Sequence, residues 1–560
     1  MLSILLPVAL SLSAPQTPQE SITRVLPLQH LCGRAEGRPL PQWGTLLQQR
    51  DGCDLTAANG EPIDLDSDDI LGLLYPAVSD AVDADRLWLH VTEAGSLLAT
   101  GNAADIAVLE TALTDAERVV NRILTVEVAA WDASDRNAPA PILDAQQFAR
   151  FVNDRQPLWR AIATTRPGRG TTLGQMHWTR YVRGINVEVA EKATVSNPVT
   201  DLFGQGGTAV VRAFSLIGCD DLAVHAQFAV GRQRGNVRVV QTGLAGSADL
   251  DLPRLESYFV NCSGRVAAGG ALAVTMRGLE ATGGDLVVTV RVQAAPAREL
   301  SDTTSALLPI GALSTAASTA RANSATLVPA DRERSQGFEE LPAFCRLSDD
   351  LLVQMVEGAI AQGEREADEV GIRGGYLYVH ADAAGIARAK ALLQDLQDRL
   401  VRNLTLHSQA TLHASPSADE PHPLLYALTL PVLLGREATA ARMLETNVIS
   451  DVFSEIAVDA SSLVPGTRPL QSGTWLHARA EPVAYGLHLD LVLQNAVAPP
   501  PTLRSVMPSG GSLMPTETEI IHRTHDGAVQ PGQTVEHGDG PTVNIDGRPY
   551  RSRMTTTVDQ

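Results

Sequence analysis

Basic and aromatic residues are both scarce in this chain of 560 residues. Lys and Arg number 44 against 64 Asp and Glu, which gives a formal net charge of −20, and aromatic residues make up 4%. A strongly acidic chain has no general attraction for phosphate backbones, so the composition argues against nucleic acid as a partner. Ala, Val and Leu have to build the core in place of aromatic rings, and the hydrophobic share of 44% is ordinary for folded protein.

Cysteine is sparse and its spacing forms no recognised pattern. The five cysteines include no C-x-x-C pair, and they match neither a zinc site nor a dense disulfide scaffold. In an exported protein, Cys32 and Cys53 are the candidate pair for one disulfide that closes a short loop. We expect Cys219, Cys262 and Cys345 to be buried small apolar residues.

Catalytic motifs are also missing. No G-x-S-x-G elbow occurs, and the Gly-rich "RPGRGTTLG" from Arg166 lacks the Lys-Ser/Thr of a phosphate-binding loop. His522, His525 and Asp526 in "HRTHDG" suggest a metal site, but no third ligand follows a known spacing, so we interpret them as polar residues at a strand end. We therefore predict no catalytic, cofactor-binding or metal-binding residues, and a protein that is not an enzyme.

Long apolar runs are limited to the amino terminus. "MLSILLPVALSLSA" is apolar, ends in small residues and precedes the first charge at Glu20, so we predict a signal peptide at 1–13 and export to the periplasm or outer membrane. The missing Lys or Arg leaves a buried apolar first strand as the alternative. No later stretch holds eighteen consecutive apolar residues, and we expect no transmembrane helix.

The chain contains an apparent internal duplication at a period of roughly 260 to 280 residues. "LLATGNAADIAVLE" from Leu97 aligns without gaps on "LYVHADAAGIARAK" from Leu377. A second block, from Glu188, is identical at eight of 26 positions to the block from Glu455, and a third block from Leu252 resembles the one from Met514. Three matches in the same order indicate two copies of one unit, joined by an Ala/Ser/Thr-rich stretch.

Each copy begins with α/β periodicity and continues with strands. Asn102 and Asp382 are good N-caps for helices, and the pairs Asp68-Asp69 and Asp349-Asp350 suit helix starts, where the helix dipole favours negative charge. Another helix is expected after Asp144. Period-two alternation from Leu286 and from Leu487 predicts strands of about eight residues, with hairpin turns at "VAAGG" and "VQPGQ".

Several short motifs occur in an order shared with a known family: Leu97 through "RILTVEV" at Arg122–Val128, Val187–Ala190, Pro198-Val199, Gly206-Gly207, Leu252-Pro253, Val266 and Gly269-Gly270. This order resembles that of the secretins, the outer-membrane ring proteins of type II and type III secretion systems, and especially planctomycete-like members. The resemblance covers about residues 61 to 293 and is weaker in the second copy. The "IGGL"-type motif that usually ends a secretin core is replaced here by "GGALAV" after Arg265.

The resemblance implies an α+β fold of two repeats, each a small ring-building (KH-like) α/β domain followed by a β-rich secretin-like core or sandwich. The predicted parts are a signal peptide (1–13), an extension (14–60), α/β domain 1 (61–135), β-rich domain 1 (141–297), a linker (298–335), α/β domain 2 (336–415), β-rich domain 2 (416–548) and a flexible tail (549–560).

The resemblance also implies a non-enzymatic envelope protein that belongs to a protein-secretion or outer-membrane assembly. Its expected partners are further copies of itself or other secretion and envelope proteins, with no cofactor and no small-molecule substrate. The alternative is a soluble periplasmic binding or scaffold module that has secretin domains without a pore. An enzyme of unrecognised type is a third, weaker alternative.

Overall fold

The computed structural model describes residues 21–28, 67–92, 96–133, 138–190, 193–243, 246–278, 285–296, 305–313, 347–361, 369–373, 375–413, 424–456, 461–484, 486–497, 504–505, 512–513, 519–545 and 548–560. The predicted signal peptide, Cys32, Cys53 and Cys345 lie outside these ranges. We call residues 21–296 the first half and residues 305–560 the second half.

The described helices begin where the sequence predicts caps. Asn102 and Asp382 each accept a hydrogen bond from a backbone amide three residues later, and Asp144 forms a full capping box with Gln147. The Ser348 hydroxyl accepts from the Leu351 amide at 3.3 Å. The helices are α2 (Ser67–Asp83), α3 (Ala103–Val120), α4 (Ala145–Val152), α5 (Asp349–Ala361) and α6 (Ala383–Leu400).

Two small antiparallel sheets each carry two of these helices. The first has the order β1-β3-β2 and the second β13-β15-β14. Their core residues come from alternate strand positions and from one face of each helix, as in Leu97, Ala99, Ile106 and Leu109. The strands are β1 (Ile22–Pro27), β2 (Leu87–Val91), β3 (Ser96–Gly101), β13 (Ser305–Pro309), β14 (Glu369–Arg373) and β15 (Tyr376–His380).

One large sheet has eight strands in the order β23-β20-β19-β18-β10-β9-β8-β7. Six of its strands are 20 to 23 residues long, several times the length of an ordinary strand. We call it the long sheet. Its strands are β7 (Gly170–Ala190), β8 (Ala193–Ser215), β9 (Leu222–Gly243), β10 (Gly246–Val266), β18 (Glu437–Ile456), β19 (Ser461–Val483), β20 (Gly486–Val497) and β23 (Glu519–Val529).

A second large sheet, the short sheet, covers one face of the long sheet. Its order is β24-β25-β16-β17-β11-β12-β4-β6, and β5 pairs with β11 in addition. Alternating residues of both sheets fill the space between them and form the largest hydrophobic cluster. The strands are β4 (Leu124–Asp132), β5 (Ile142–Leu143), β6 (Pro157–Thr165), β11 (Ala271–Gly278), β12 (Leu286–Ala294), β16 (Asn403–His413), β17 (Leu424–Leu433), β24 (Thr534–Ile545) and β25 (Arg548–Asp559).

The two halves pair their strands in the same order. In the first half, β4 pairs with β6 and β12, and β7 to β10 pair consecutively. In the second half, β16 pairs with β17 and β25, and β18, β19, β20 and β23 pair consecutively. The minor strands β21 (Arg504–Ser505) and β22 (Ser512–Leu513) have no place in this scheme.

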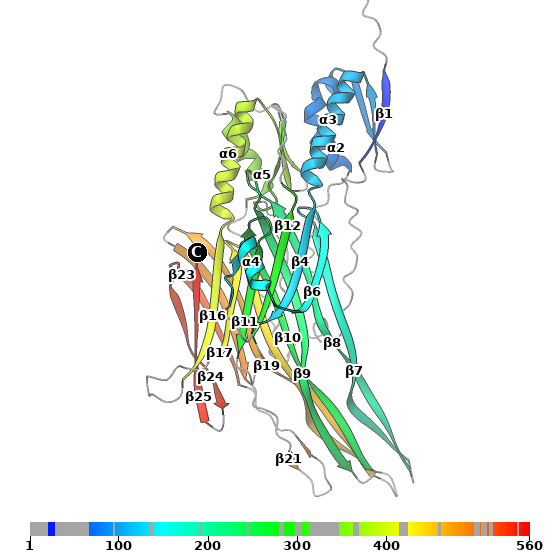
Figure 1. Ribbon diagram of the computed structural model, residues 1–560, viewed down its shortest axis with the longest axis vertical. Coiled ribbons are helices and arrows are strands. Elements are labelled where there is room, and N and C mark those ends of the chain that lie inside the picture. Colours follow the sequence, from blue (N-terminus) through cyan, green and yellow to red (C-terminus); the bar gives the residue numbers. More distant parts are fainter. Residues whose placement is uncertain are drawn as a thin grey trace, which may run out of the picture.

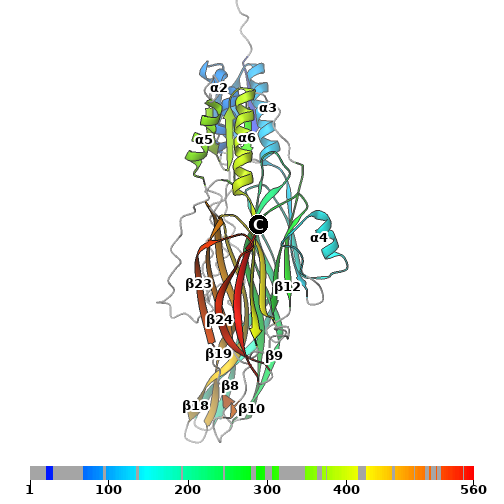
Figure 2. The same ribbon diagram turned by 90° about the vertical axis from the view of Figure 1, so that its left-hand side faces the viewer.

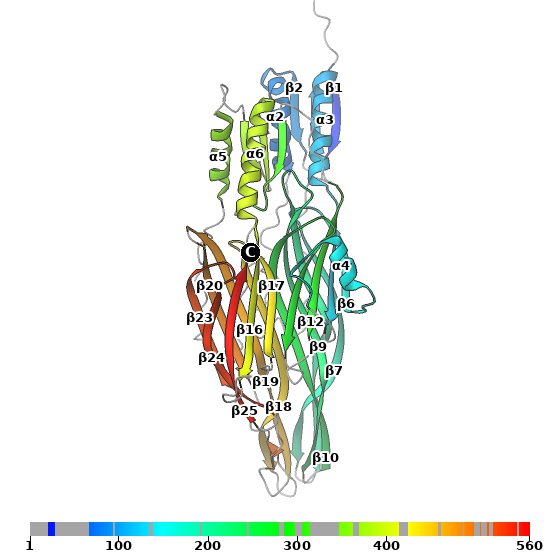
Figure 3. The ribbon, with the colours of Figure 1, turned by 60° about the vertical axis from the view of Figure 1, so that its left-hand side comes forward.

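The parts are stacked along the long axis of the molecule. The helical units lie at one end, the two large sheets lie in the middle, and the long hairpins of the long sheet extend to the other end (Figure 1). The view turned by 90° shows α5 and α6 beside α2 and α3 (Figure 2). Figure 3 shows α4 on the outside of the short sheet, where Phe148 packs on Trp131 and Ala271.

Four expectations from the sequence are wrong. The β-rich parts do not form separate sandwiches, because both large sheets run continuously through the two halves. The predicted linker contains β13, the edge strand of the second small sheet, and the predicted flexible tail forms β25. The segment expected to close the first α/β domain, β4, belongs to the short sheet. Strand lengths of about eight residues underestimate most strands of the long sheet, because glycine and proline interrupt their alternation.

Glycine at one position of β19 is required by the close approach of β18. Gly473 has φ +148°, and a Cβ there collides with the Arg442 carbonyl oxygen and lies 2.9 Å from the Met443 Cα. We expect Gly473→Ala to lower the free energy of unfolding by more than about 1 kcal/mol. Gly358→Ala is the control, because Gly358 lies in α5 with open space around it and should gain about 0.5–1 kcal/mol. Thermal unfolding followed by circular dichroism measures both, and a wild-type midpoint for Gly473→Ala contradicts the strand register.

Candidate functional site: the seam between the two halves

The two halves meet along one line of strand pairing in each large sheet. β10 pairs with β18 over Arg254–Asn261 and Thr439–Thr446, and β11 pairs with β17 over Thr275–Gly278 and Tyr426–Thr429. We call these two pairings together the seam. The seam contains Glu256, a fully buried carboxylate, and side-chain clamps that join the two halves, so we treat it as the candidate functional site.

A buried carboxylate lies at the centre of the seam. Glu256 of β10 is completely buried and accepts hydrogen bonds from Arg232 (2.5 Å) and Arg234 (2.6 Å) of β9. From the other half, Arg442 of β18 donates Nε and Nη2 to the second carboxylate oxygen, at 3.1 and 3.0 Å. Tyr258 completes the group by accepting from Arg232 at 2.8 Å. One carboxylate therefore links both halves.

The balance of charge in this cluster favours the ionised carboxylate. Burial alone raises the pKa of Glu256, but the guanidinium groups of Arg232 and Arg442 act against it and hold the pKa below its usual value. Burial raises the pKa of the Tyr258 phenol, which keeps it a neutral hydrogen-bonding group. Arg442 also touches Gly278 at the end of β11, where a Cβ would collide with its guanidinium. The cluster thus contacts the seam in both sheets.

A pair of side-chain clamps fixes the other end of the seam. The Asn403 amide, at the start of β16, accepts from the Arg265 backbone N–H at 2.6 Å and donates to the Arg265 carbonyl at 2.9 Å. The Ser263 hydroxyl accepts from the Leu433 backbone N–H at 2.9 Å. These bonds attach the last residues of β10 to the second half after its pairing with β18 has ended.

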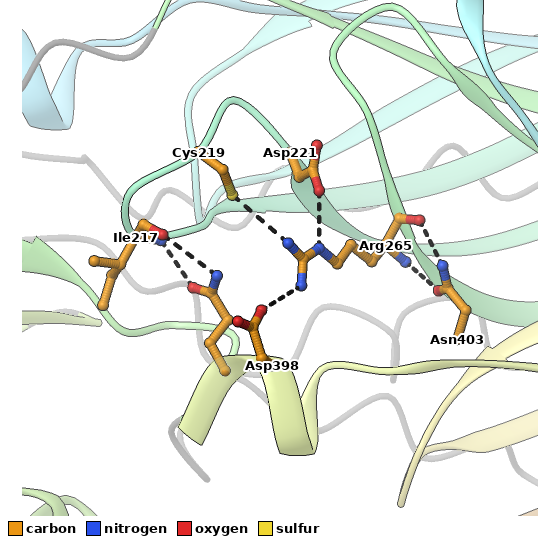
Figure 4. A network of polar contacts seen from close by, with 7 residues as sticks. Ile217, Cys219, Asp221, Arg265, Asp398 and Asn403 are labelled. Carbon is orange, nitrogen blue, oxygen red and sulfur yellow. Dashed lines mark hydrogen bonds and ion pairs between the residues drawn. The ribbon is translucent and has the colours of Figure 1, made fainter. Parts of the chain in front are cut away.

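The helix α6 is attached by a second amide clamp, shown in Figure 4. The buried Gln397 side chain accepts from the Ile217 backbone N–H at 2.8 Å and donates to the Ile217 carbonyl at 3.4 Å. The Arg265 guanidinium lies between Asp221 of the first half, at 2.9 Å, and Asp398 of α6, at 3.0 Å. Its remaining nitrogen is 3.8 Å from the Cys219 sulfur. All these contacts join α6 to the turn between β8 and β9.

The two helical units also contact each other across the halves. Leu307 of β13 and Tyr376 of β15 are buried in the same cluster as residues of α2 and α3. The outer face of the second small sheet is therefore covered by the helices of the first. A cavity of about 240 Å³ lies between α3, the β8–β9 turn and β13, lined in part by Arg118, Arg122 and Lys390. Arg122 donates to Ala295, Ser215 and Asp220, so its polar groups are engaged within the chain.

The residues that the sequence analysis weighed as sites remain apart. His522, His525 and Asp526 lie on β23, where His522 contacts Gln494 and Asp526 contacts His488. Within the described ranges, no three His, Cys, Asp or Glu side chains gather into a possible metal site. Cys262 is buried, as expected, and Cys219 is half-buried; both are free thiols. No helix in the described part of the chain is long and apolar enough to cross a membrane.

The seam residues were missed by motif reasoning because no local pattern marks them. Glu256 and Arg442 are 186 residues apart, and only the strand pairing brings them together. A usable signal was present, however. Glu256 and Arg232 occupy core-facing positions in strands whose neighbouring core positions are apolar, and a buried charge normally has an opposite partner.

Removing the charge of Glu256 tests the cluster. We expect Glu256→Gln to lower the free energy of unfolding by about 3 kcal/mol at pH 7, because Arg232 and Arg442 lose their buried counter-ion. Since folding lowers the carboxyl pKa, its contribution is present above the ordinary value of 4.5 and is lost as pH falls through the folded value. The difference between wild type and variant should therefore shrink below about pH 4.5.

Urea unfolding at pH 7 and at pH 3.5 measures this difference, and Glu110→Gln on the exposed face of α3 is the control. A gap between wild type and Glu256→Gln that is the same at both pH values contradicts the assignment.

Removing one clamp tests the attachment of the second half. We expect Asn403→Ala to lower the free energy of unfolding by about 1–3 kcal/mol, because two partly buried backbone groups of Arg265 lose their partners. Hydrogen exchange should rise mainly in α6 and at the end of β10. The control is Arg399→Ala, which removes only an exposed ion pair with Asp395 and should change little. Unchanged exchange in Asn403→Ala contradicts a clamping role.

Comparisons with known proteins identify no family for this chain. No protein-family model and no curated protein matches it. Among solved structures, the secretin domain of InvG from the Salmonella SPI-1 injectisome base matches with a TM-score of 0.17 and 10% identity, over 39% of this chain and 76% of that one. ExeD of Aeromonas hydrophila matches with a TM-score of 0.16 and 9% identity, over 96% of this chain and 89% of that one. Superpositions with such low TM-scores do not establish a shared architecture.

Proposed function

We propose that this chain is a non-enzymatic, secretin-like structural protein of the cell envelope, and that it forms part of a protein-secretion or outer-membrane assembly by associating with further copies. In this proposal the chain is exported, its helical units stack beside those of neighbours, and the long sheet lines or supports a channel. The observation that carries the proposal is the form of the long sheet.

The hairpins of the long sheet are much longer than a sandwich core requires. β7 to β10, β18 and β19 have 20 to 23 residues, while the described strands of the short sheet have 12 or fewer. Strands of 20 residues span more than about 60 Å at 3.3 Å per residue. The hairpins therefore extend beyond the second layer (Figure 1), which suits a wall or gate shared by several chains.

The buried polar groups of the described chain support a structural role. The Glu256 cluster and the Asn403 and Gln397 clamps engage charges and amides with each other or with backbone groups. Such pairing favours rigidity and a defined register over chemistry. These contacts stabilise the junction between the two halves, which a structural subunit under mechanical load needs to keep rigid.

The equal order of strand pairing supports the further proposal that the halves are copies of one unit. Gly206 and Gly473, which the sequence aligns, both have positive φ and both approach a neighbouring strand closely. Each copy then has one helical unit above four strands of the long sheet. The chain in this view contains two structural units of an assembly in covalent succession.

Purified full-length protein should form discrete large oligomers, because the open sheet edges leave long rows of backbone groups for pairing. Sedimentation velocity with and without detergent, followed by negative-stain microscopy, measures this. Particles with rotational symmetry are the expected result. A protein that stays monomeric at high concentration in both conditions contradicts the proposal and favours the soluble periplasmic module.

A further inference from the structure

We infer that the seam inside the chain is repeated between chains: β23 and β24 of one copy pair with β7 and β6 of a second copy. This inference rests on the proposed function, since it names the partner and the surfaces through which the assembly grows.

The strands at the open ends of both large sheets correspond to the strands of the seam. By order of pairing, β23 corresponds to β10 and β7 to β18, and these are the ends of the long sheet. In the short sheet, β24 corresponds to β11 and β6 to β17, and these are again the ends. Each sheet thus has the two complementary sides of a seam at its two opposite ends, so that a second copy can continue both sheets.

Such a contact joins different surfaces of the two copies. A head-to-tail contact of this kind produces a closed ring or an open filament rather than a two-fold dimer. The helical units follow the same direction, because α5 and α6 lie on the β23–β24 flank while β1 lies on the outside of the opposite flank (Figures 1 and 3). A neighbour added to either flank therefore contacts the long sheet, the short sheet and a helical unit at the same time.

The register between copies follows from the register of the seam. Gly170 of β7 corresponds to Glu437 of β18, because they pair with the equivalent residues Arg212 and Arg479 in the neighbouring strands. β10 and β23 align through Val266 and Val529, which face Leu222 and Leu487. The pair of Asn261 with Thr439 in the seam then corresponds to Thr524 of one copy opposite Thr172 of the next.

Apolar residues are exposed where the corresponding residues are buried at the seam. Val25 of β1 is 64% exposed, whereas Leu307, at the same place in β13, is 8% exposed and is covered by α2 and α3 of the other half. Val483, the last residue of β19, is 43% exposed, whereas the corresponding Leu216 is buried against the second half. A second copy would cover both residues in the way that the seam covers their counterparts.

The opposite surfaces carry matching apolar residues. Ile123, at 61% exposure, holds the position of Asn403, the clamp residue, and Leu351 is exposed on α5. In a repeated seam, Ile123 of one copy approaches the end of β19 that holds Val483 of its neighbour, and Leu351 lies on the unit that faces Val25. The polar clamp inside the chain is therefore replaced by an apolar contact between chains.

The charge cluster occurs only inside the chain. Glu519 corresponds to Glu256, but Val497 takes the place of Arg232 and Gln175 the place of Arg442. Pairing β10 with β7 of another copy would bring Gln175, not Arg442, to the buried Glu256. The cluster therefore favours pairing of β10 with β18 of its own chain, so that β7 remains available to pair with β23 of the next chain. First and second halves then alternate along the assembly.

A cysteine pair tests this register directly. Thr172 and Thr524 are both exposed on strands at the ends of the long sheet, so that cysteines there leave the core intact. We expect oxidation of assembled Thr172→Cys/Thr524→Cys protein to give a ladder of covalent multimers on non-reducing gels. The ladder should disappear when the disulfides are reduced. Co-expression of Thr172→Cys chains with Thr524→Cys chains should stop at covalent dimers. The control pair Arg180→Cys/Thr524→Cys lies eight residues out of register on the same face and should remain uncross-linked.

Three outcomes overturn the inference. Oligomers by sedimentation that show no ladder would mean that assembly uses other surfaces, and the proposed function would survive. Covalent dimers of Thr172→Cys alone would mean that β7 pairs with β7 in a two-fold contact. Protein that stays monomeric at every concentration would overturn the inference together with the proposed function. A ladder from the matched pair and none from the Arg180 pair supports the repeated seam.

Discussion

The pairing of β10 with β18 is the contact on which the rest of this structure depends. It turns four strands from each half into one eight-stranded sheet, and the antiparallel pairing of β11 with β17 joins the halves in the second layer in the same way. Backbone pairing alone permits slippage by two residues, so register needs side chains. Glu256 supplies it, because only one alignment brings Arg232, Arg234 and Arg442 to the same carboxylate.

The parts of the fold that the sequence predicted are local. Asn102, Asp144 and Asp382 cap their helices because a side-chain oxygen three residues before an amide needs nothing else from the fold. What could not be predicted is non-local. β13 completes a small sheet with β15, which follows it by about 70 residues, and the tail becomes β25 because β16 and β24 offer backbone partners on both sides.

The sequence could mark Glu256 and Arg232 as charges at core-facing positions, but their partners across the seam could not be predicted for the same reason. Gln397 looks like a surface residue of an amphipathic helix, and only the β8–β9 turn beneath it makes it a clamp on Ile217. Buried charge that unites the halves, and apolar residues that remain exposed on the flanks, give the chain two kinds of junction. The charged groups are paired within the chain, whereas the apolar residues would be buried only by a second copy. This difference fits a subunit that folds before it assembles.

The most direct test of this account is the symmetry of the assembled particle by electron cryomicroscopy. If the seam is repeated between chains, the rotation that relates the two halves of one chain will equal the rotation that relates the second half to the first half of the next. The long hairpins will then be evenly spaced, with two groups for every chain. Chains that meet through any other surface, with unevenly spaced halves, would contradict the account.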